Sequence, residues 1–462
     1  MKTAIYVYGL YVIFSGIFSN AVANEVPVVV TDDIEVISVV GSRLASHRAI
    51  VEKSQANQVM DALSADDIGQ LPDVNIADAF RRITGVQTIN DSDEGSFISV
   101  RGIDPDLNLV TLDGMQLPVT DSDGGRRVNL EMLPGSAVKR LEVYKTFTPE
   151  HNHNAIGGVL NLVSKSAYDH TGFRLLLDGA INSYSLKDVP EDHDDSLGGM
   201  LGVFYSDKLD DAEQFGVVFS ASYNEKNRDE QKVSNDSYRY DNHLQAPINE
   251  RLRTLQYTNS WQRYGSSLKL EWRPDSELYS YLNNFYFTLK EDEHRNFVYL
   301  ENRDSANEQT GLLPEEQVFS ETTGVVRKAR NTQRYSWRPT ERTQQGSHFH
   351  IEKTFQYFNR IAFDLSYGMG EYNRPYNDFR FRTNSTTQLG YRYDMLGLYT
   401  QIQLNQPDYI TDPNNYQFSG GSFRLDYQQE QLTQTRLAYS WNVDDNAEGV
   451  GVMVGVSNRY TR

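Results

Sequence analysis

The chain has 462 residues, a formal net charge of −19 and no cysteine. The absence of cysteine excludes a disulfide framework, a thiolate metal site and a cysteine nucleophile. The negative charge argues against a nucleic-acid partner, because phosphate groups require a basic surface.

The first residues have the pattern of a secretory signal peptide. Lys2 supplies the positive end, Ala4 to Phe18 forms an apolar run, and Ala21-Val22-Ala23 is a small-x-small cleavage site. We therefore expect a signal peptide over residues 1–23. The alternative is an N-terminal membrane anchor, which is disfavoured because the apolar run is shorter than the ~20 residues of a spanning helix.

Residues 24–62 are predicted to be flexible and extended. Within them, the run Asp33-Ile34-Glu35-Val36-Ile37-Ser38-Val39-Val40 is β-prone and ends at Gly41-Ser42-Arg43. A strand-ready segment near a mature N-terminus is suited to pairing with the edge of another protein's sheet, where backbone hydrogen bonds supply the affinity. The alternative is a linker that is rich in valine, and the pattern alone does not separate the two.

Residues 63–168 are predicted to form one compact α+β domain. Ser64-Ala65-Asp66-Asp67 has the spacing of a capping box, and apolar periodicity predicts a helix over Val74–Ile83. The pair Asp113-Gly114 lies between two apolar runs and predicts a two-residue hairpin turn. Further strands are predicted at Phe97–Arg101, Leu141–Tyr144 and Val159–Val163.

From residue 169 to residue 462 the sequence alternates along strands of about ten residues, the length with which a tilted strand crosses a bilayer. The chain has 29 Tyr and 21 Phe residues, which fit the aromatic girdles of a transmembrane β-barrel. The clearest alternating runs are Phe215–Tyr223, Tyr279–Leu289, Ile361–Met369 and Leu437–Val443.

The predicted connections between these strands are of two kinds. Asn359-Arg360 is predicted to be a short turn, whereas Asp188–Asp195 and Glu291–Gln333 are predicted to be long polar loops. Outer-membrane barrels have unequal loops of this kind on their two sides. A soluble β-sandwich is the alternative, and the many aromatic residues and long loops disfavour it.

Several short motifs of the predicted α+β domain occur in the order and spacing of one family. They are Val100-Arg101-Gly102, Leu112-Asp113-Gly114, Arg140–Lys145 and Ile156-Gly157-Gly158-Val159. In these motifs the chain resembles the TonB-dependent outer-membrane receptors, and the resemblance covers essentially the whole chain. Asp33–Val40 is similar to the TonB box of that family. Residues 123–128 and 145–154 are more similar to a proteobacterial subfamily associated with oligosaccharide uptake than to siderophore receptors.

The resemblance implies a fold in which an α+β plug domain lies inside an antiparallel transmembrane β-barrel. The family's barrel has about 22 strands, which requires more residues than residues 169–462 provide. We therefore expect an incomplete barrel, from the N-terminal portion of a longer protein or from a truncated gene product. Lipid cannot satisfy unpaired sheet edges, so we expect that this chain alone does not form a stable pore.

The resemblance also implies TonB-dependent active transport across the outer membrane of a Gram-negative bacterium, with no enzymatic activity. The implied partners are TonB with its inner-membrane energising complex, outer-membrane lipid and a small extracellular solute, expected to be a carbohydrate. Solute binding would shift the plug toward a state in which Asp33–Val40 is released to pair with TonB. Two alternatives stay open: a siderophore or metal-chelate receptor, and a non-transporting surface adhesin or phage-receptor remnant.

Two arginines match plug residues that pair with barrel carboxylates in the family, namely Arg101 and Arg140. The resemblance implies that they form a releasable latch, since buried ion pairs have a small net stabilisation. The alternative for Arg101 is that it caps local carbonyl groups. Structural roles in turns and close packing are expected for Gly102, Asp113, Gly114, Gly157 and Gly158.

No cofactor, metal site or catalytic residue is expected. His151 and His153 lie beside Glu150, but an exposed polar loop explains them without a metal ion. No serine lies in a nucleophile-elbow pattern, and no phosphate-binding glycine loop is present.

Overall fold

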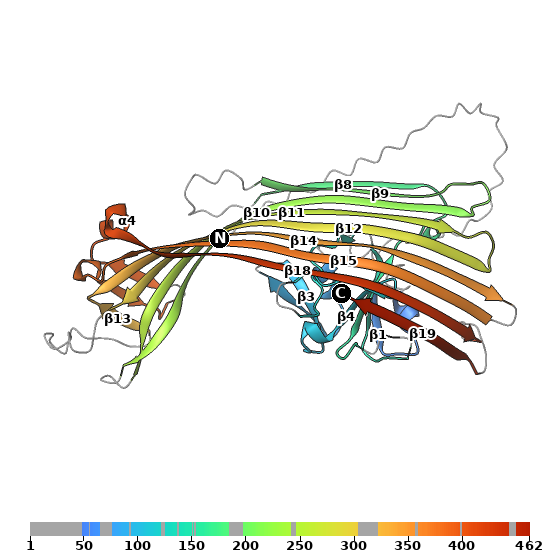
Figure 1. Cartoon of the computed structure of the whole chain (residues 1–462), viewed down its shortest axis with the longest axis horizontal. Coiled ribbons are helices and arrows are strands. Elements are labelled where there is room, and N and C mark those ends of the chain that lie inside the picture. Colours follow the sequence, from blue (N-terminus) through green and yellow to red (C-terminus); the bar gives the residue numbers. More distant parts are fainter. Residues whose placement is uncertain are drawn as a thin grey trace, which may run out of the picture.

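The structure is a computed structural model. It describes residues 49–54, 56–64, 76–91, 94–121, 125–135, 138–149, 151, 154–183, 197–241, 246–303, 322–355, 359–397, 400–442 and 450–462. The expected signal peptide and the expected TonB box, Asp33–Val40, lie outside these residues. Figure 1 shows a long curved sheet with a smaller domain against one side of it.

A five-stranded sheet forms the centre of the smaller domain, which we call the plug. Its strand order is β1-β6-β7-β4-β5; β4 and β7 are parallel, and the other neighbours are antiparallel. The predicted strands over 141–144 and 159–163 are confirmed within β6 and β7. The bounds are β1 Met60–Ser64, β4 Leu109–Leu112, β5 Met115–Gln116, β6 Val138–Tyr144 and β7 Val159–Ser164.

A hairpin and a short helix complete the plug. Strand β2 (Val86–Asp91) pairs with β3 (Glu94–Val100), and α3 (Ile76–Phe80) packs beside them. The predicted turn at Asp113-Gly114 is confirmed, because these two residues join β4 to β5 with φ angles of 50° and 80°. Such positive φ angles are those that a two-residue hairpin turn requires.

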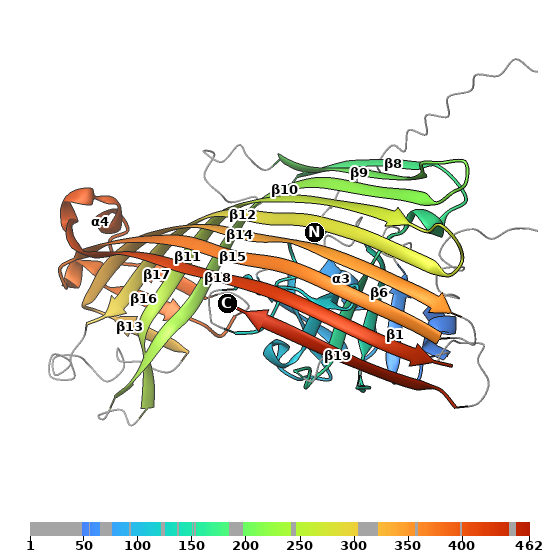
Figure 2. The ribbon, with the colours of Figure 1, turned by 45° about the vertical axis from the view of Figure 1, so that its right-hand side comes forward.

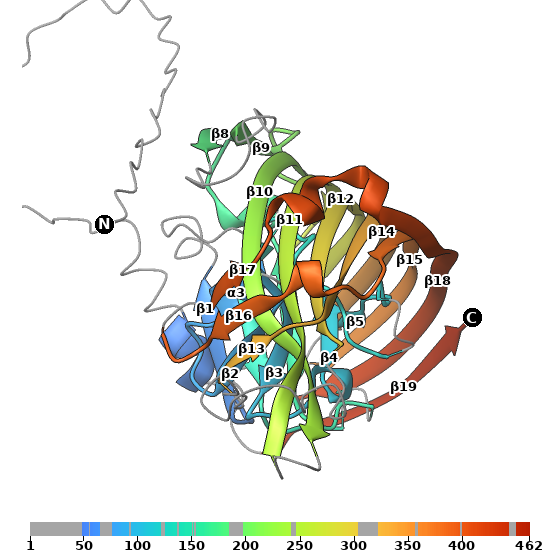
Figure 3. The same cartoon turned by 90° about the vertical axis from the view of Figure 1, so that its left-hand side faces the viewer.

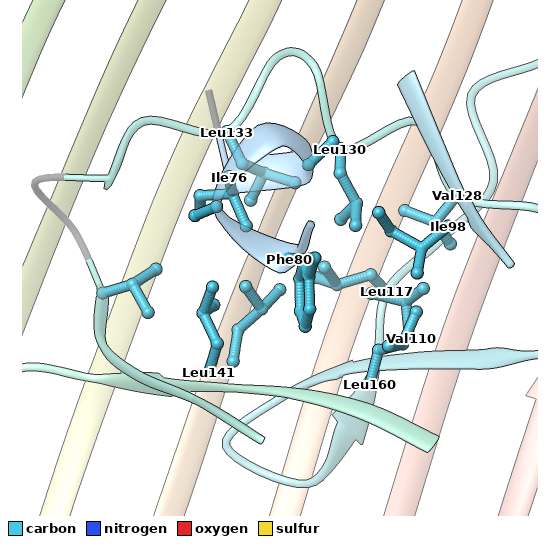
Figure 4. Packing of buried hydrophobic residues seen from close by; sticks show 14 of the residues in the cluster. Ile76, Phe80, Ile98, Val110, Leu117, Val128, Leu130, Leu133, Leu141 and Leu160 are labelled. Carbon is cyan, nitrogen blue, oxygen red and sulfur yellow. The ribbon is translucent and has the colours of Figure 1, made fainter. Parts of the chain in front are cut away.

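The core of the plug lies between α3 and the five-stranded sheet (Figure 4). Ile76 and Phe80 are fully buried and point at Leu141 and Leu160 from the sheet and at Leu130 from the segment that follows. Burying one such side chain contributes about 1.5–3 kcal/mol. The apolar face that the sequence predicted for this helix is therefore what fixes α3 on the sheet.

One prediction near the start of the plug is wrong. Residues 49–54 are helical and Met60–Ser64 is a strand, so the extended N-terminal segment does not reach residue 62. Ser64 is the last residue of β1 and lies opposite Arg140 of β6. The rest of the predicted capping box, Ala65-Asp66-Asp67, lies outside the described residues.

A second, nine-stranded antiparallel sheet curves around the plug, and we call it the wall. Its strand order is β19-β18-β15-β14-β12-β11-β10-β9-β8, so β8 and β19 are its two edges. Figures 2 and 3 show the plug on the concave side of this open sheet. The bounds are β8 Arg174–Ser183, β9 Leu197–Lys208, β10 Phe215–Asp241, β11 Ala246–Trp272, β12 Leu278–Asn302, β14 Ala329–Phe355, β15 Asn359–Thr383, β18 Tyr416–Trp441 and β19 Val452–Thr461.

The alternation predicted for the wall is confirmed, but the predicted runs face in different directions. Phe215, Ile361 and Leu437 are 49%, 42% and 47% exposed, on the face away from the plug. Phe287 and Leu289 are almost completely buried and pack into the plug core. A period of two residues identifies a strand but does not say which face is covered.

Two predicted connections of the wall, the 291–333 loop and the Asn359-Arg360 turn, are wrong, because the central strands are longer than a bilayer requires. The predicted loop Asp188–Asp195 lies outside the described residues. Strands β10, β11 and β14 have 27 residues each. At ~3.3 Å per residue, such a strand spans about 90 Å, against ~30 Å for the hydrocarbon core. Much of the predicted 291–333 loop therefore belongs to β12 and β14, and Asn359 and Arg360 begin β15 instead of forming a turn.

The ends of the long strands carry a small sheet of their own, far from the plug (Figure 1). Strands β13 (Thr323–Val326), β16 (Tyr391–Asp394) and β17 (Gln401–Leu404) form it, and α4 (Asp408–Thr411) lies nearby. Tyr391 and Tyr393 are buried in its core. Among the described residues, no helix is both long and apolar enough to cross a bilayer.

Candidate functional site: the contacts between plug and wall

One buried ion cluster joins the plug to the wall. Nη2 of Arg263, in β11, contacts a carboxylate oxygen of Glu94 and lies 3.2 Å from Oε1 of Glu131. Nζ of Lys226, in β10, donates to the other oxygen of Glu94 at 2.8 Å. Glu94 and Glu131 belong to the plug, so two plug carboxylates meet two wall cations.

The surroundings of this cluster exclude water. The side chains of Arg263, Glu94 and Glu131 are 7%, 2% and 3% exposed. The ring of Trp261 lies 5.3 Å from the guanidinium of Arg263 and belongs to the same apolar cluster as the plug core. Burial raises the pKa of Glu131 above its ordinary value, although the positive charge of Arg263 opposes this.

A second polar contact is built on the Asp113-Gly114 turn. The carboxylate of Asp113 accepts hydrogen bonds from the backbone N–H and the hydroxyl of Ser164, at 2.8 Å and 2.6 Å. Nζ of Lys269, in β11, donates to the same hydroxyl at 3.0 Å. Burial alone would raise the pKa of Asp113, but the charge of Lys269 and the Ser164 hydrogen bonds hold it below its ordinary value.

Side chains of the wall also bind the backbone of the plug's edge strand, β5, and of the residues that follow it. Oε1 of Gln434 accepts from the N–H of Gln116 at 3.0 Å, while its Nε2 donates to the carbonyl of the same residue at 2.9 Å. Nε2 of Gln344 donates to the carbonyl of Pro118 at 2.7 Å. Oε2 of Glu430 accepts from the N–H of Val119 at 2.6 Å.

The two arginines expected to form a latch contact the plug itself. Nη1 of Arg101 donates to the carbonyl of Lys145 at 3.2 Å, which is the local capping that the sequence left as an alternative. Arg140 lies 2.6 Å from carboxylate oxygens of both Glu52 and Glu142. Burial opposes the charge of Arg140, but Glu142 and Glu52 raise its pKa. Whether either arginine also meets a carboxylate of the barrel stays a prediction.

Among the described residues, the ion pairs of the Glu94–Arg263–Glu131 cluster join plug and wall with the opposite polarity, with the carboxylates on the plug. Sequence reasoning missed Glu94, Glu131 and Arg263 because 169 and 132 residues separate the arginine from its two partners. One signal was available. Arg263 lies two residues from Trp261 and therefore shares its face, and a charged residue on a covered strand face requires a partner.

The expected structural glycines lie in the plug at two kinds of position. Gly102 and Gly114 have φ angles of 76° and 80°, which residues with a side chain rarely adopt. Gly157 and Gly158 lie under close packing instead, where a Cβ atom would meet Oδ1 of Asn108 at 2.3 Å and Cγ2 of Val100 at 3.0 Å respectively.

The histidine motif of the sequence lies partly outside the described residues, which include His151 but not Glu150 or His153. Nδ1 of His151 lies 3.1 Å from the hydroxyl of Thr148, and its ring packs on Tyr144. In the part of the chain that the structure describes, no three His, Cys, Asp or Glu side chains are arranged to hold a metal ion.

Residues 52–159 match the family described as the TonB-dependent Receptor Plug Domain. Similar solved structures include the ferric enterobactin receptor PfeA of Pseudomonas aeruginosa, at 12% identity and a TM-score of 0.38, with 86% of this chain and 71% of that chain covered. The outer membrane transporter YddB of Escherichia coli gives 12% identity and a TM-score of 0.36, with coverages of 83% and 61%. The ferripyoverdine receptor of P. aeruginosa gives 12% identity and a TM-score of 0.38, with coverages of 88% and 52%.

The chain thus spans between 52% and 71% of the length of these three structures. Residues 52–159 thus match the TonB-dependent Receptor Plug Domain family, and in the structure they lie on the concave side of a nine-stranded antiparallel sheet (Figure 2).

Proposed function

We propose that this chain supplies the plug and part of the barrel wall of a TonB-dependent transporter in the outer membrane of a Gram-negative bacterium. The observation that carries the proposal is the buried Glu94–Arg263–Glu131 cluster, which joins a recognised plug domain to the concave face of a β-sheet. Such a contact holds the plug while its charges are paired. Its net stabilisation is small, because desolvation offsets most of the attraction between the charges.

The N-terminal end of the plug lies where a force on the preceding segment would act first. Strand β1 is an edge of the plug sheet and pairs only with β6 among the described strands. Just before it, Glu52 pairs with Arg140, and Asp61 of β1 pairs with both Lys53 and Lys145. Burial opposes the ionisation of Asp61, but the two lysines lower its pKa below the ordinary value.

In the proposed mechanism, Asp33–Val40 adds as a strand to a sheet of TonB, in which backbone hydrogen bonds give the affinity. Force on this segment reaches the Glu52–Arg140 and Lys53–Asp61 pairs first and the β1–β6 ladder next. The chain is exported by the proposed signal peptide of residues 1–23. The solute is an oligosaccharide, as the similarity of residues 145–154 to the oligosaccharide-uptake subfamily suggests.

The test is energised uptake in cells that carry the gene. Deleting residues 33–40 is expected to abolish uptake of a labelled oligosaccharide while leaving its binding to the cells intact. A deletion of equal length over residues 24–31 is the control and is expected to leave uptake in place. Unchanged uptake after the first deletion contradicts the proposal. Induction of the gene by iron starvation alone would favour a metal chelate as the solute.

A further inference from the structure

Beyond the plug, the concave face of the wall carries a set of arginines. Gln344 of β14 contacts the plug, and Arg342, Arg338 and Arg334 follow it at every second or fourth residue along the same strand. Side chains separated by an even number of residues point to the same face of a strand, so these arginines face the interior too. We define the arginine row as Arg295 of β12, Arg334, Arg338 and Arg342 of β14, Arg374 of β15, and Arg424 of β18.

Every guanidinium of the arginine row lies over an aromatic ring. Arg338 and Arg424 share the ring of Tyr376, at 4.6 Å and 5.1 Å from its centre, and Arg342 and Arg374 share the ring of Tyr372, at 5.3 Å and 5.5 Å. Arg295 lies 4.6 Å from the ring centre of Tyr257, and Arg334 lies 5.1 Å from that of Phe297. The rings of Phe297, Tyr372 and Tyr376 are buried, whereas most of the arginine side chains are partly exposed. A guanidinium held by its face keeps the N–H groups at its edge available for acceptors.

The described wall supplies fewer carboxylates to the arginine row than the row has charges. Arg295 and Arg338 share Glu293, and Arg374 and Arg424 share Asp426. Asp378 likewise lies between Arg334 and Arg380, which is just outside the row. The remaining arginine, Arg342, lies 3.6 Å from Glu291.

Six positive charges therefore meet four carboxylates of the wall, Glu291, Glu293, Asp378 and Asp426, in a chain whose net charge is −19. An acidic protein that concentrates arginine on one inner face creates a local field that attracts anions. Arginine forks on shared carboxylates retain N–H groups that can bind the carboxylate or sulfate of a ligand in the same way.

The arginine row extends over a considerable length of the wall. Arg334 and Arg342 are eight residues apart on one strand, which corresponds to about 26 Å at ~3.3 Å per residue. Arg374 and Arg424 extend the same face across two further strands, β15 and β18. A single small anion would occupy one fork only. A solute with several anionic groups would contact several.

We propose that the arginine row binds a polyanionic solute, one that carries several carboxylate or sulfate groups. The proposal rests on the transport function proposed above and names the charge class of its solute. The row begins directly beyond the plug, because Oε1 of Glu291 accepts a hydrogen bond from Nε1 of Trp261 at 2.9 Å, and Trp261 packs on Arg263. A bound polyanion would thus lie next to the Glu94–Arg263–Glu131 cluster.

The test measures equilibrium binding to outer-membrane fractions from cells that express the gene. The probes are oligogalacturonate, its fully methyl-esterified form of equal length, and ferric citrate. We expect oligogalacturonate to bind at least about tenfold more tightly than the neutral ester, with affinity falling as salt rises. Equal affinity for the acid and the ester, or failure of both anions to bind, overturns the proposal.

Variants locate the site. Combined Arg338→Gln and Arg374→Gln substitutions are expected to weaken anion binding by at least about tenfold. Arg338→Lys with Arg374→Lys is expected to retain only part of the binding, because lysine keeps the charge but lacks the planar fork of N–H groups. Arg360→Gln is the matched control, because Arg360 lies near the opposite end of β15 and contacts Glu352 instead of the row. Full binding by the double Gln variant overturns the assignment to the row. Unchanged protease resistance of the plug in membranes shows that a variant has folded.

The outcomes separate this inference from the proposed function. Binding of ferric citrate without oligogalacturonate supports an anion site and contradicts the oligosaccharide assignment. Tight oligogalacturonate binding without TonB-dependent uptake supports the arginine row and contradicts the transport function.

Discussion

The contact between Arg263 and the two plug carboxylates gives the sharpest prediction. Replacing Arg263 by Ala leaves Glu94 and Glu131 buried without their shared partner. Removing one member of a buried ion pair costs about 3–5 kcal/mol, and Lys226 still neutralises part of the charge on Glu94. We therefore expect Arg263→Ala to weaken the attachment of the plug by about 3 kcal/mol. At about 1.4 kcal/mol for each factor of ten, this raises the population of the detached plug roughly 100-fold.

The absence of cysteine makes this population measurable without background labelling. Thr120 is completely buried, one residue from the Val119 N–H that Glu430 binds, so a Thr120→Cys thiol reacts with a maleimide only when the plug moves. When opening and closing are fast, the labelling rate follows the population of the open state. We expect Arg263→Ala to raise this rate by about two orders of magnitude.

Arg251→Ala is the matched control, because Arg251 lies in the same strand but pairs with Asp236, far from the plug. It is expected to change the labelling rate by less than about threefold, since partly exposed pairs contribute little. Adding Glu94→Gln to Arg263→Ala is expected to restore part of the protection, because it removes an unpaired buried charge. A parental labelling rate in folded Arg263→Ala protein would show that the cluster does not hold the plug.

Two further predictions concern the plug itself. Gly157→Ala is expected to destabilise the plug by about 1–3 kcal/mol in chemical denaturation, because the new Cβ would meet Oδ1 of Asn108 at 2.3 Å. Gly172→Ala has open space around it and should leave the midpoint unchanged. The pKa of Asp113 is held below the ordinary 3.8, so its contribution is present above that pH and is lost as the pH falls through the lower folded value. Asp113→Asn should therefore lower the thermal midpoint at pH 6, and the difference from the parent should shrink toward pH 3; a constant difference would refute the role of its charge.

Local patterns made much of the plug predictable. The turn at Asp113-Gly114 and strand β7 over Val159–Ser164 depend on residues that are adjacent in the sequence, and the structure contains both. The boundary at residue 63 was misplaced because β1 is short and obtains its stability from β6, about eighty residues later. Pairing over that distance has no local signature.

The wall shows why strand length was harder to predict than strand identity. Residues 291–296 of β12 alternate between two polar faces, one with Glu291 and Glu293 and the other with Asp292 and His294. Without an apolar face, such a segment resembles a loop in sequence. In the structure its backbone is satisfied by β11 and β14 on either side, and its inward charges by arginines on neighbouring strands.

The candidate site could not have been assembled from spacing, since the plug carboxylates and Arg263 come from three distant segments. The prediction that arginines on the plug face carboxylates on the barrel followed the family pattern. In the described residues, the ion pairs of the cluster have the reverse arrangement, with Glu94 and Glu131 on the plug and the cations on the wall.

The side-chain amide of Gln434 satisfies both backbone hydrogen-bonding groups of Gln116, on the edge strand β5, without a strand of the wall pairing there. If a strand of the wall paired with β5, plug and wall would share one continuous ladder of backbone hydrogen bonds. Separating them would then require breaking that ladder one residue pair after another. A side-chain amide can instead rotate away and leave both groups of Gln116 to water. The plug can then leave the wall as a unit, with the hydrogen bonds of its own sheet intact.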